Sequence, residues 1–462
     1  MSSNATAGAV APADDERGMV RVVIASLMGA AIEWYDFFLF GSVAALVFNK
    51  LFYPSFDPLV GTLLSMSTFA VGFLARPVGA LVFGHFGDLI GRKKLLVASL
   101  LLMGGATTLI GFLPTYATAG VLAPILLILC RLLQGFAVGG EWGGAVLMVA
   151  ERGSARRRGF WSSWPNVGMP IGQGLAIAVL AILTATTSDE AFLSWGWRVP
   201  FLLSALLVLV GLYIRLSMDE SPVFKAAQAA KLARERAEAS KPVMPAVQVL
   251  RHYWREVLRV MGARFCENVN GYVITVFTLT YATTHLGLDR QVALNGVLIG
   301  CFFHALSIPV WGALSDRFGR RPLYAGGAAG IGIWGFVLFP LIDTGSSFAI
   351  TAAISVALVC HGAMLGPQGA FFSELFGTSV RYSGASIGVQ FASIFAGSLA
   401  PIIAVALLAE YGSSIPVSVY MLITAIVTVS VVLTTRETRN RDLSFDHTDP
   451  APAAVAAVPA TR

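Results

Sequence analysis

One loop pattern occurs twice in the chain: residues 84–94 read GHFGDLIGRKK, and residues 312–322 read GALSDRFGRRP. Each copy follows a long apolar stretch and combines glycines, one aspartate and a run of basic residues. The two aspartates, Asp88 and Asp316, are 228 residues apart. An internal repeat of this kind predicts that the chain folds as two structurally related halves.

A second pair of motifs supports the duplication. Glu151 is followed seven residues later by Arg158, and Glu374 is followed seven residues later by Arg381. The two glutamates are 223 residues apart, which is close to the offset of the loop pattern. Two motif pairs with nearly one offset indicate that both halves contain the same succession of elements.

The composition is that of a membrane protein. Of the 462 residues, 56% are hydrophobic and 13% are charged, whereas soluble domains carry about 25% charged residues. The net charge of +6 could indicate nucleic acid as a partner, but the basic residues lie in loops between apolar segments and form no stripe. The four cysteines lie singly inside apolar stretches, without the spacing of a metal site or a disulfide framework. We interpret them as packing residues and expect neither nucleic acid nor a metal.

The apolar segments are long enough to cross a bilayer, which takes about 20 residues of α-helix. The predicted fold is therefore an all-α membrane protein, with twelve transmembrane helices in two pseudo-symmetric six-helix bundles. The approximate bounds of the segments are residues 19–48, 59–86, 93–113, 119–149, 160–186, 195–216, 257–285, 291–315, 322–342, 346–373, 383–409 and 415–435.

These segments divide the chain into five parts. We expect an N-terminal tail at 1–18, a first bundle at 19–216, a central loop at 217–256, a second bundle at 257–435 and a C-terminal tail at 436–462. Lysine and arginine are enriched in cytoplasmic loops, and here they gather in the central loop and in one alternate set of short loops. Both termini and the central loop are therefore predicted to lie in the cytoplasm.

The repeated motifs resemble those of the major facilitator superfamily, whose second helix is followed by Gly, Asp and Gly-Arg-Lys and whose eighth helix is followed by a weaker copy. RLLQGFAVGGEWGG at residues 131–144 resembles the fourth-helix motif of that superfamily. EWYDFFLFG at 33–41, FLARPVGALVFGHFGD at 73–88 and SWGWRVPF at 194–201 are similar to the metabolite:proton symporter family. Members of that family import proline and betaine, 2-oxoglutarate, citrate, shikimate and related metabolites. The resemblance covers nearly the whole chain and implies a transporter of the bacterial inner membrane.

The loop motifs predict a gate at the cytoplasmic ends of the helices. A carboxylate there can accept hydrogen bonds from the first amides of a helix or from arginines, and basic residues at the next helix start hold the ends together. Breaking this cluster would favour the inward-open state. The alternative is that the basic residues only anchor the loops at the membrane surface. The gate candidates are Asp88, Arg92, Lys93, Lys94, Glu151, Arg158, Asp316, Arg317, Arg320, Glu374 and Arg381.

Charged groups inside the apolar segments are the candidates for substrate binding and proton coupling, because a charge near the bilayer centre costs at least a few kcal/mol. Arg76 and His304 each precede a loop-motif aspartate by 12 residues, which predicts a depth of about 18 Å from the cytoplasmic end for both. We interpret His361 as a packing or hydrogen-bonded core histidine. The candidates are Glu33, Asp36, Arg76, Arg131, Glu141, Arg264, Glu267 and His304.

Two pairs of these charges lie three residues apart and therefore share a helical face: Glu33 with Asp36, and Arg264 with Glu267. A desolvated carboxylate beside a second carboxylate holds a proton more readily, as a proton carrier must. A nearby arginine opposes protonation, and does so less when substrate occupies it. Arg131 and a further candidate, Glu141, could instead be fixed structural charges.

The sequence predicts proton-coupled uptake of a small polar metabolite, an organic acid such as shikimate, a dicarboxylate or an aromatic acid. Family members that respond to osmolarity carry a C-terminal coiled coil, but no apolar heptads follow Thr435, which favours an organic acid over proline or betaine. An efflux antiporter is a further alternative, with a mainly apolar cavity. A membrane enzyme or sensor is disfavoured, because P-loop, HExxH and triad motifs are absent from the sequence. We expect no catalytic residue and no cofactor; the expected partners are substrate, protons and lipid, and the expected state is a monomer.

Overall fold

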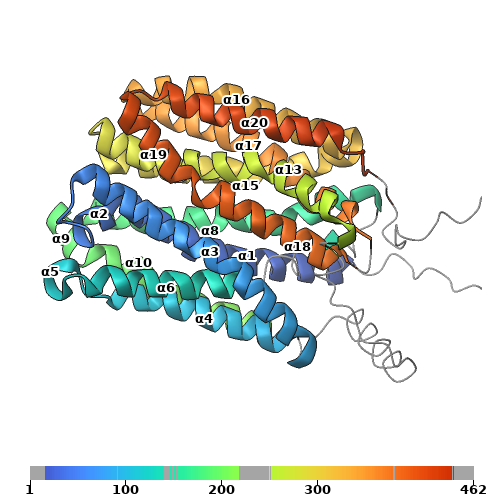
Figure 1. Ribbon diagram of the computed structural model, residues 1–462, viewed down its shortest axis with the longest axis horizontal. Coiled ribbons are helices and arrows are strands. Elements are labelled where there is room, and N and C mark those ends of the chain that lie inside the picture. Colours follow the sequence, from blue (N-terminus) through green and yellow to red (C-terminus); the bar gives the residue numbers. More distant parts are fainter. Residues whose placement is uncertain are drawn as a thin grey trace, which may run out of the picture.

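The computed structural model describes residues 16–90, 92–139, 146, 149–150, 155–217, 249, 251–377, 380–439 and 441. Within these ranges every regular element is helical, and the long helices run roughly along one axis (Figure 1). The first half of the chain contributes α1 (Glu16–Val43), α3 (Pro58–Ile90), α4 (Arg92–Phe112), α6 (Leu122–Val138), α8 (Arg158–Thr186) and α10 (Val199–Ser217), with short α2 (Asn49–Leu51), α5 (Tyr116–Ala119) and α9 (Asp189–Ser194). The second half contributes α13 (Trp254–Tyr272), α14 (Thr278–Thr280), α15 (Arg290–Phe318), α16 (Arg320–Asp343), α17 (Ser347–Leu375), α18 (Arg381–Ala392), α19 (Ala400–Tyr411) and α20 (Ile415–Thr434).

The lengths of the helices suit a bilayer. Nine helical spans among the described residues are long and apolar enough to cross a membrane, and Val97–Phe112 and Leu122–Val138 are shorter apolar helices. A further helical run begins with α13 and continues through the π-helical turn η4 (Val273–Phe277), α14 and the π-helical turn η5 (Tyr281–His285). The first part of this run is rich in charged residues, which lowers its hydropathy. Together these helices account for the twelve predicted segments, and the all-α prediction is confirmed for the described residues.

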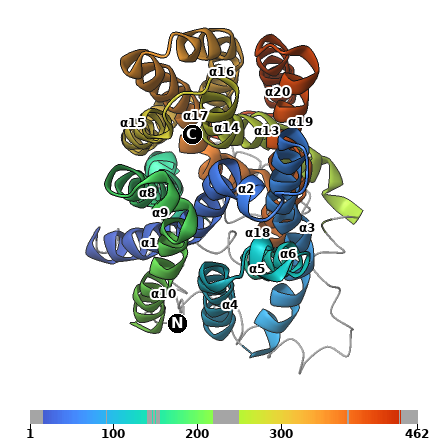
Figure 2. The same ribbon diagram turned by 90° about the vertical axis from the view of Figure 1, so that its left-hand side faces the viewer.

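The helices of each half form their own bundle. Figure 2, which looks along the helices, shows the first-half helices (blue to green) as one group and the second-half helices (yellow to red) as another. Within the first bundle α3 packs on α6 and α4 on α10, and within the second α16 packs on α17 and α20. The bundles meet where α8 packs against α15 and α17, and where α3 packs against α19 and the π-helical turn η6 (Ser393–Ser398). We call this boundary the seam.

Helices α3 and α6 approach each other backbone to backbone. A Cβ atom on Gly135 would lie 1.9 Å from the carbonyl oxygen of Gly72, and one on Gly139 would lie 2.0 Å from the carbonyl oxygen of Arg76. Only glycine permits such a contact, which is the small-residue packing typical of membrane helices. The close approach places Arg76 on α3 beside the helix that carries Arg131.

One π-helical turn repeats between the halves. The π-helical turn η1 (Ala44–Phe48) continues α1, and η4 continues α13. Their first residues, Ala44 and Val273, are 229 residues apart, within one residue of the 228 that separate the loop-motif aspartates. The duplication read from the sequence therefore extends to irregular turns, which occur most often at functional sites.

Candidate functional site

The first bundle buries a chain of four polar side chains. Asp36 on α1 accepts a hydrogen bond of 2.9 Å from the hydroxyl of Thr107 on α4, and Gln134 on α6 donates to the same hydroxyl over 2.6 Å. Arg131, one turn before Gln134, donates to its side-chain oxygen over 3.2 Å. All four side chains are at most 3% exposed. Three helices thus hold a carboxylate and a guanidinium in one hydrogen-bonded line.

The guanidinium groups of Arg76 and Arg131 lie over aromatic rings. The Arg131 guanidinium is 4.4 Å from the ring centre of Phe40 and 4.5 Å from that of Phe37. The Arg76 guanidinium is 4.5 Å from the ring centre of Phe37 and 4.6 Å from that of Phe73. A desolvated cation over a ring is stabilised by about 2 kcal/mol. Phe37 therefore supports both cations while leaving hydrogen-bonding atoms unused.

A small cavity lies among these groups. Its volume is about 10 Å³, close to the minimum that holds one water molecule. Glu33, Asp36, Arg76, Arg131 and Gln134 supply its polar lining. Within the described part of the chain, Asp36 Oδ1, Arg76 Nε and Arg131 Nη2 have no hydrogen-bond partner. The residues around the cavity thus offer unused hydrogen-bond donors and an unused acceptor, which are the groups that a binding site for a polar molecule requires.

The second bundle holds a separate buried network. Arg264 Nε lies 3.4 Å from the carboxylate of Glu267 on α13, and His361 Nε2 on α17 lies 2.9 Å from the Glu267 carbonyl oxygen. Because a carbonyl only accepts, His361 carries its proton on Nε2 and accepts on Nδ1 from His304 Nε2, 3.1 Å away. This order leaves His304 Nδ1 as an acceptor, with no partner among the described residues. Although Arg76 and His304 hold the same position relative to the loop motif, their partners differ.

An aromatic cluster joins the two sets of charges across the seam. The ring of Tyr272 on α13 lies 5.6 Å from the rings of Phe69 and Phe73 on α3. It lies 5.8 Å from those of Phe37 and Phe38 on α1. Two of these rings also contact the Arg76 guanidinium. A movement of one bundle against the other would therefore disturb the rings that contact this cation.

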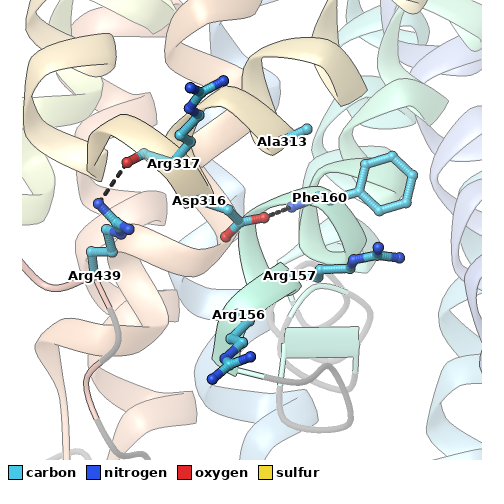
Figure 3. Close-up of a pocket in the computed structure, with 7 residues that line it drawn as sticks. All are labelled: Arg156, Arg157, Phe160, Ala313, Asp316, Arg317 and Arg439. Atoms are coloured by element: carbon cyan, nitrogen blue, oxygen red, sulfur yellow. Dashed lines mark hydrogen bonds between the residues drawn. The ribbon is translucent and has the colours of Figure 1, made fainter.

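At the end of the seam that carries residues 312–322, which we call the motif end, Asp316 binds the start of a helix. Its carboxylate accepts from the backbone N–H groups of Gly159 over 2.8 Å and Phe160 over 2.9 Å, at the first residues of α8. Figure 3 shows the bond from Phe160. Arg320 donates to the same carboxylate over 2.7 Å. A carboxylate at a helix N-terminus satisfies free amides and the positive end of the helix dipole. Asp316 thus ties the second bundle to the first.

Glu374 on α17 forms the other centre of the motif end. It lies 2.9 Å from Arg158 Nη1, 3.4 Å from Arg320 Nη2 and 2.7 Å from the hydroxyl of Thr438. Arg441 donates to the Glu374 carbonyl oxygen, and its own carbonyl oxygen accepts from Arg158 over 3.0 Å. Residues after α20 therefore bridge both bundles. We call the group of Arg158, Asp316, Arg320 and Glu374 the seal.

Glu437 fastens the segment after α20 to the start of α16. Its carboxylate accepts from the backbone N–H groups of Arg320 over 3.0 Å and Arg321 over 3.1 Å. Partial burial raises the pKa of Glu437, but the backbone N–H donors of Arg320, Arg439, Arg321 and Thr438 outweigh burial and hold this pKa below its usual value near 4.5. The carboxylate is therefore ionised at neutral pH and caps the helix.

The opposite end of the seam is also bridged. Arg290 on α15 pairs with Asp189 on α9, and Thr184 on α8 donates to Gln291 over 2.6 Å. Among the described residues, contacts thus bridge the seam at both of its ends.

The structure brings together part of the predicted gate, because four of its residues form the seal. Arg317 is exposed beside the seal, where its carbonyl oxygen accepts from Arg439 over 2.6 Å, and buried Arg381 donates to the Ser373 carbonyl oxygen over 3.1 Å. Glu141 and Glu151, and the side chains of Asp88, Arg92, Lys93 and Lys94, lie outside the part of the structure that is described.

Sequence reasoning missed several members of these networks. Gln134 lies three residues after Arg131, so the rule that such residues share a helical face could have found it. Thr107 is an ordinary threonine in an apolar helix and gives no signal. Thr438 and Arg441 follow the last span in a segment without periodicity, and only the fold brings them to Glu374.

Comparison with protein families matches residues 21–447 to the family of sugar (and other) transporters. The shikimate transporter of Escherichia coli K12 is 40% identical over 422 residues, which cover 91% of this chain and 95% of that protein. The inner membrane metabolite transport protein YhjE of the same organism is 41% identical over 428 residues, covering 92% and 95%. The proline/betaine transporter of Escherichia coli K12 is 33% identical over 434 residues, covering 93% and 86%.

Solved structures share the fold at lower identity. A D-xylose-proton symporter superposes with a TM-score of 0.72 at 18% identity, covering 92% of this chain and 99% of that one. The partially occluded, inward-open xylose transporter XylE from Escherichia coli superposes with a TM-score of 0.70 at 19% identity, again covering 92% and 99%. The predicted architecture of two six-helix bundles is confirmed.

Proposed function

The chain belongs to the sugar (and other) transporter family of the major facilitator superfamily, and we propose that it imports a small organic acid together with protons. It is a multi-pass membrane transporter of small molecules and not an enzyme. The observation that carries the proposal is the burial of Arg76 and Arg131 beside Glu33 and Asp36, around one cavity inside the first bundle. A guanidinium pairs with a carboxylate through charge-assisted and often bidentate hydrogen bonds, so the site suits an anionic metabolite.

In this proposal the motif end faces the cytoplasm of a bacterial inner membrane. The arginines around the seal support this orientation, because cytoplasmic loops are rich in lysine and arginine. The seal then closes the cytoplasmic side, and the pair of Arg290 with Asp189 closes the outer side. Transport consists of rocking the two bundles, residues 19–216 and 257–435, so that the two ends of the seam open in turn.

Asp36 is our proposed proton carrier. It lies in a hydrogen-bonded line with Arg131 through Thr107 and Gln134, and it is almost completely buried. A substrate carboxylate that binds Arg76 and Arg131 offsets their positive charge, so the neutral, protonated form of Asp36 becomes more favourable. Substrate and proton then increase each other's affinity by the same factor, which is the coupling that symport requires.

Shikimate is the first substrate to test, because the shikimate transporter is 40% identical along nearly the whole chain. Proline and betaine are the second choice, on the evidence of the proline/betaine transporter at 33% identity. These osmolytes are zwitterions, whereas shikimate is an anion at neutral pH. Two buried arginines around one cavity favour the anion.

The test is uptake of radiolabelled metabolites into proteoliposomes that contain the purified chain. The panel comprises shikimate, citrate, 2-oxoglutarate, an aromatic acid, proline and betaine. We expect one acid to accumulate only under an inward proton gradient and the accumulation to collapse when a protonophore is added. Accumulation that needs a sodium gradient contradicts the proton assignment, and uptake restricted to proline or betaine contradicts the organic-acid assignment.

A further inference from the structure

The motif end contains a second pocket, on the surface of the seam. Its volume is about 650 Å³, and Figure 3 shows that its lining comes from both bundles. We propose that this pocket binds the phosphate-bearing headgroup of an anionic lipid. The residues that line it are Arg156, Arg157, Phe160, Ala313, Asp316, Arg317 and Arg439.

The charge of the pocket is strongly positive. Arg156 and Arg157 lie in the turn before α8, Arg317 lies in the last turn of α15, and Arg439 follows α20. None of these four exposed guanidinium groups forms an ion pair with a residue in the described ranges. The carboxylate of Asp316, which also lines the pocket, already accepts hydrogen bonds from the first backbone N–H groups of α8 and from buried Arg320. Four arginines that form no ion pair with a described residue, from three segments, suit a phosphate, which accepts several charge-assisted hydrogen bonds.

An apolar stripe distinguishes a lipid from a free phosphate ion. Ala313 in the pocket wall is followed up α15 by Val310 and Leu306, at the spacing of one helical face. Val310 and Leu306 are each 57% exposed, and Figure 2 shows α15 at the edge of the molecule, next to α8. Acyl chains can lie along this stripe while the headgroup reaches the arginines, as occurs at basic pockets between membrane helices. A free phosphate would make no use of the stripe.

The position of the pocket gives lipid binding a consequence for transport. Arg156 and Arg157 belong to the first bundle, Arg317 belongs to the second, and Arg439 follows the last helix of the second bundle. The complete site therefore exists only while the seal is closed. A ligand that binds one of two states shifts the population toward that state, so an anionic lipid should keep the motif end closed for longer.

Native mass spectrometry of the full-length protein tests binding directly, with phosphatidylglycerol and phosphatidylcholine as probes. We expect tighter binding of phosphatidylglycerol and a loss of at least about tenfold in its affinity for the double variant Arg156→Gln, Arg157→Gln. Arg156→Lys, Arg157→Lys should retain most of the affinity, because the charge remains. The matched control is Arg255→Gln, Arg259→Gln, which removes the same charge at the start of α13, away from the pocket.

Three outcomes overturn the proposal. Equal binding of the two lipids removes the selectivity for anionic headgroups. If the control variant loses as much affinity for phosphatidylglycerol, the effect comes from the net charge of the protein and not from the pocket. Protection of the purified protein against heat by inorganic phosphate, to the same extent as by phosphatidylglycerol, assigns the pocket to the free ion.

A second measurement tests the effect on the seam without depending on the affinity of the variants. Ser163 on α8 is completely buried and lies against Gly312 of α15, so a cysteine at this position reacts with a maleimide only when the motif end opens. We expect Ser163→Cys to react at least about threefold more slowly in liposomes that contain phosphatidylglycerol than in phosphatidylcholine alone. The difference should disappear in the Arg156→Gln, Arg157→Gln background. Equal rates in the two lipids contradict the proposed state dependence.

Discussion

Arg158 of the first bundle donates to Glu374 of the second bundle over 2.9 Å, and the side chain of Glu374 is completely buried. The same carboxylate also pairs with Arg320 and accepts from Thr438. A buried ion that loses its partner is destabilised by about 3–5 kcal/mol. Opening of the seam at this end would separate Arg158 from Glu374, so we expect the seal to favour the closed state.

Replacement of the central carboxylate of the seal should open the motif end. Glu374→Gln leaves Arg158 without its buried counter-ion and Arg320 with Asp316 alone, and we expect Ser163→Cys to react with a maleimide at least about tenfold faster in this background. The control is Glu410→Gln, on the exposed end of α19, which should leave the rate unchanged. An unchanged rate in Glu374→Gln would show that the seal does not hold the seam.

Loss of the Arg76 guanidinium should weaken substrate binding. A charge-assisted hydrogen bond to a carboxylate contributes about 1.5–3 kcal/mol, so Arg76→Ala should raise the Kd of the transported acid at least tenfold, because about 1.4 kcal/mol is a factor of ten. Arg76→Lys keeps the charge but not the bidentate geometry and should give an intermediate Kd. Equilibrium binding of the labelled acid measures both variants. Normal affinity in Arg76→Ala would exclude this residue from the substrate site.

Removal of the proposed proton carrier should separate binding from coupling. Asp36→Asn keeps the shape of the side chain and can still accept from Thr107, but it cannot exchange a proton. We expect accumulation driven by a proton gradient to be lost, while counterflow exchange of labelled and unlabelled substrate continues. If Asp36→Asn still concentrates substrate against its gradient, the proton is carried elsewhere, with Glu33 and Glu267 as the next candidates.

The glycine contact between α3 and α6 should tolerate no side chain. Gly135→Ala places a Cβ atom 1.9 Å from the Gly72 carbonyl oxygen, and overpacking of this kind costs about 1–3 kcal/mol. We expect a lower Tm and less folded protein in the membrane. Gly105→Ala on α4 is the matched control, since its Cβ meets nothing within 4 Å; it should be neutral or slightly stabilising. Equal Tm values in the two variants would contradict the packing argument.

Sequence patterns predicted the fold more completely than they predicted the candidate site. The loop pattern around Asp88 and Asp316 identified the duplication, because it repeats within the sequence. The length of the apolar stretches identified the spans, because a helix needs about 20 residues to cross a bilayer. The sequence predicted that Arg158 and Glu374 both belong to the gate, but it did not predict that they pair. The two residues are 216 positions apart, and no local pattern shows which charges meet at that separation. The link from Asp36 to Arg131 depends on Thr107 and Gln134. Nothing in the sequence distinguishes Thr107 from other threonines in apolar helices, and only the packing of α1, α4 and α6 brings it to Asp36.

Two buried arginines, Arg131 and Arg158, obtain their hydrogen-bond acceptors at different times during synthesis. Arg131 donates to the Phe69 carbonyl oxygen and to Gln134, so its acceptors leave the ribosome with it. Arg158 cannot pair until Glu374 has been synthesised, 216 residues later. Synthesis of these residues takes roughly 10 to 40 s at typical rates of translation. The bonds of Arg131 can therefore form within the first bundle, but a stalled or truncated chain leaves Arg158 without its carboxylate.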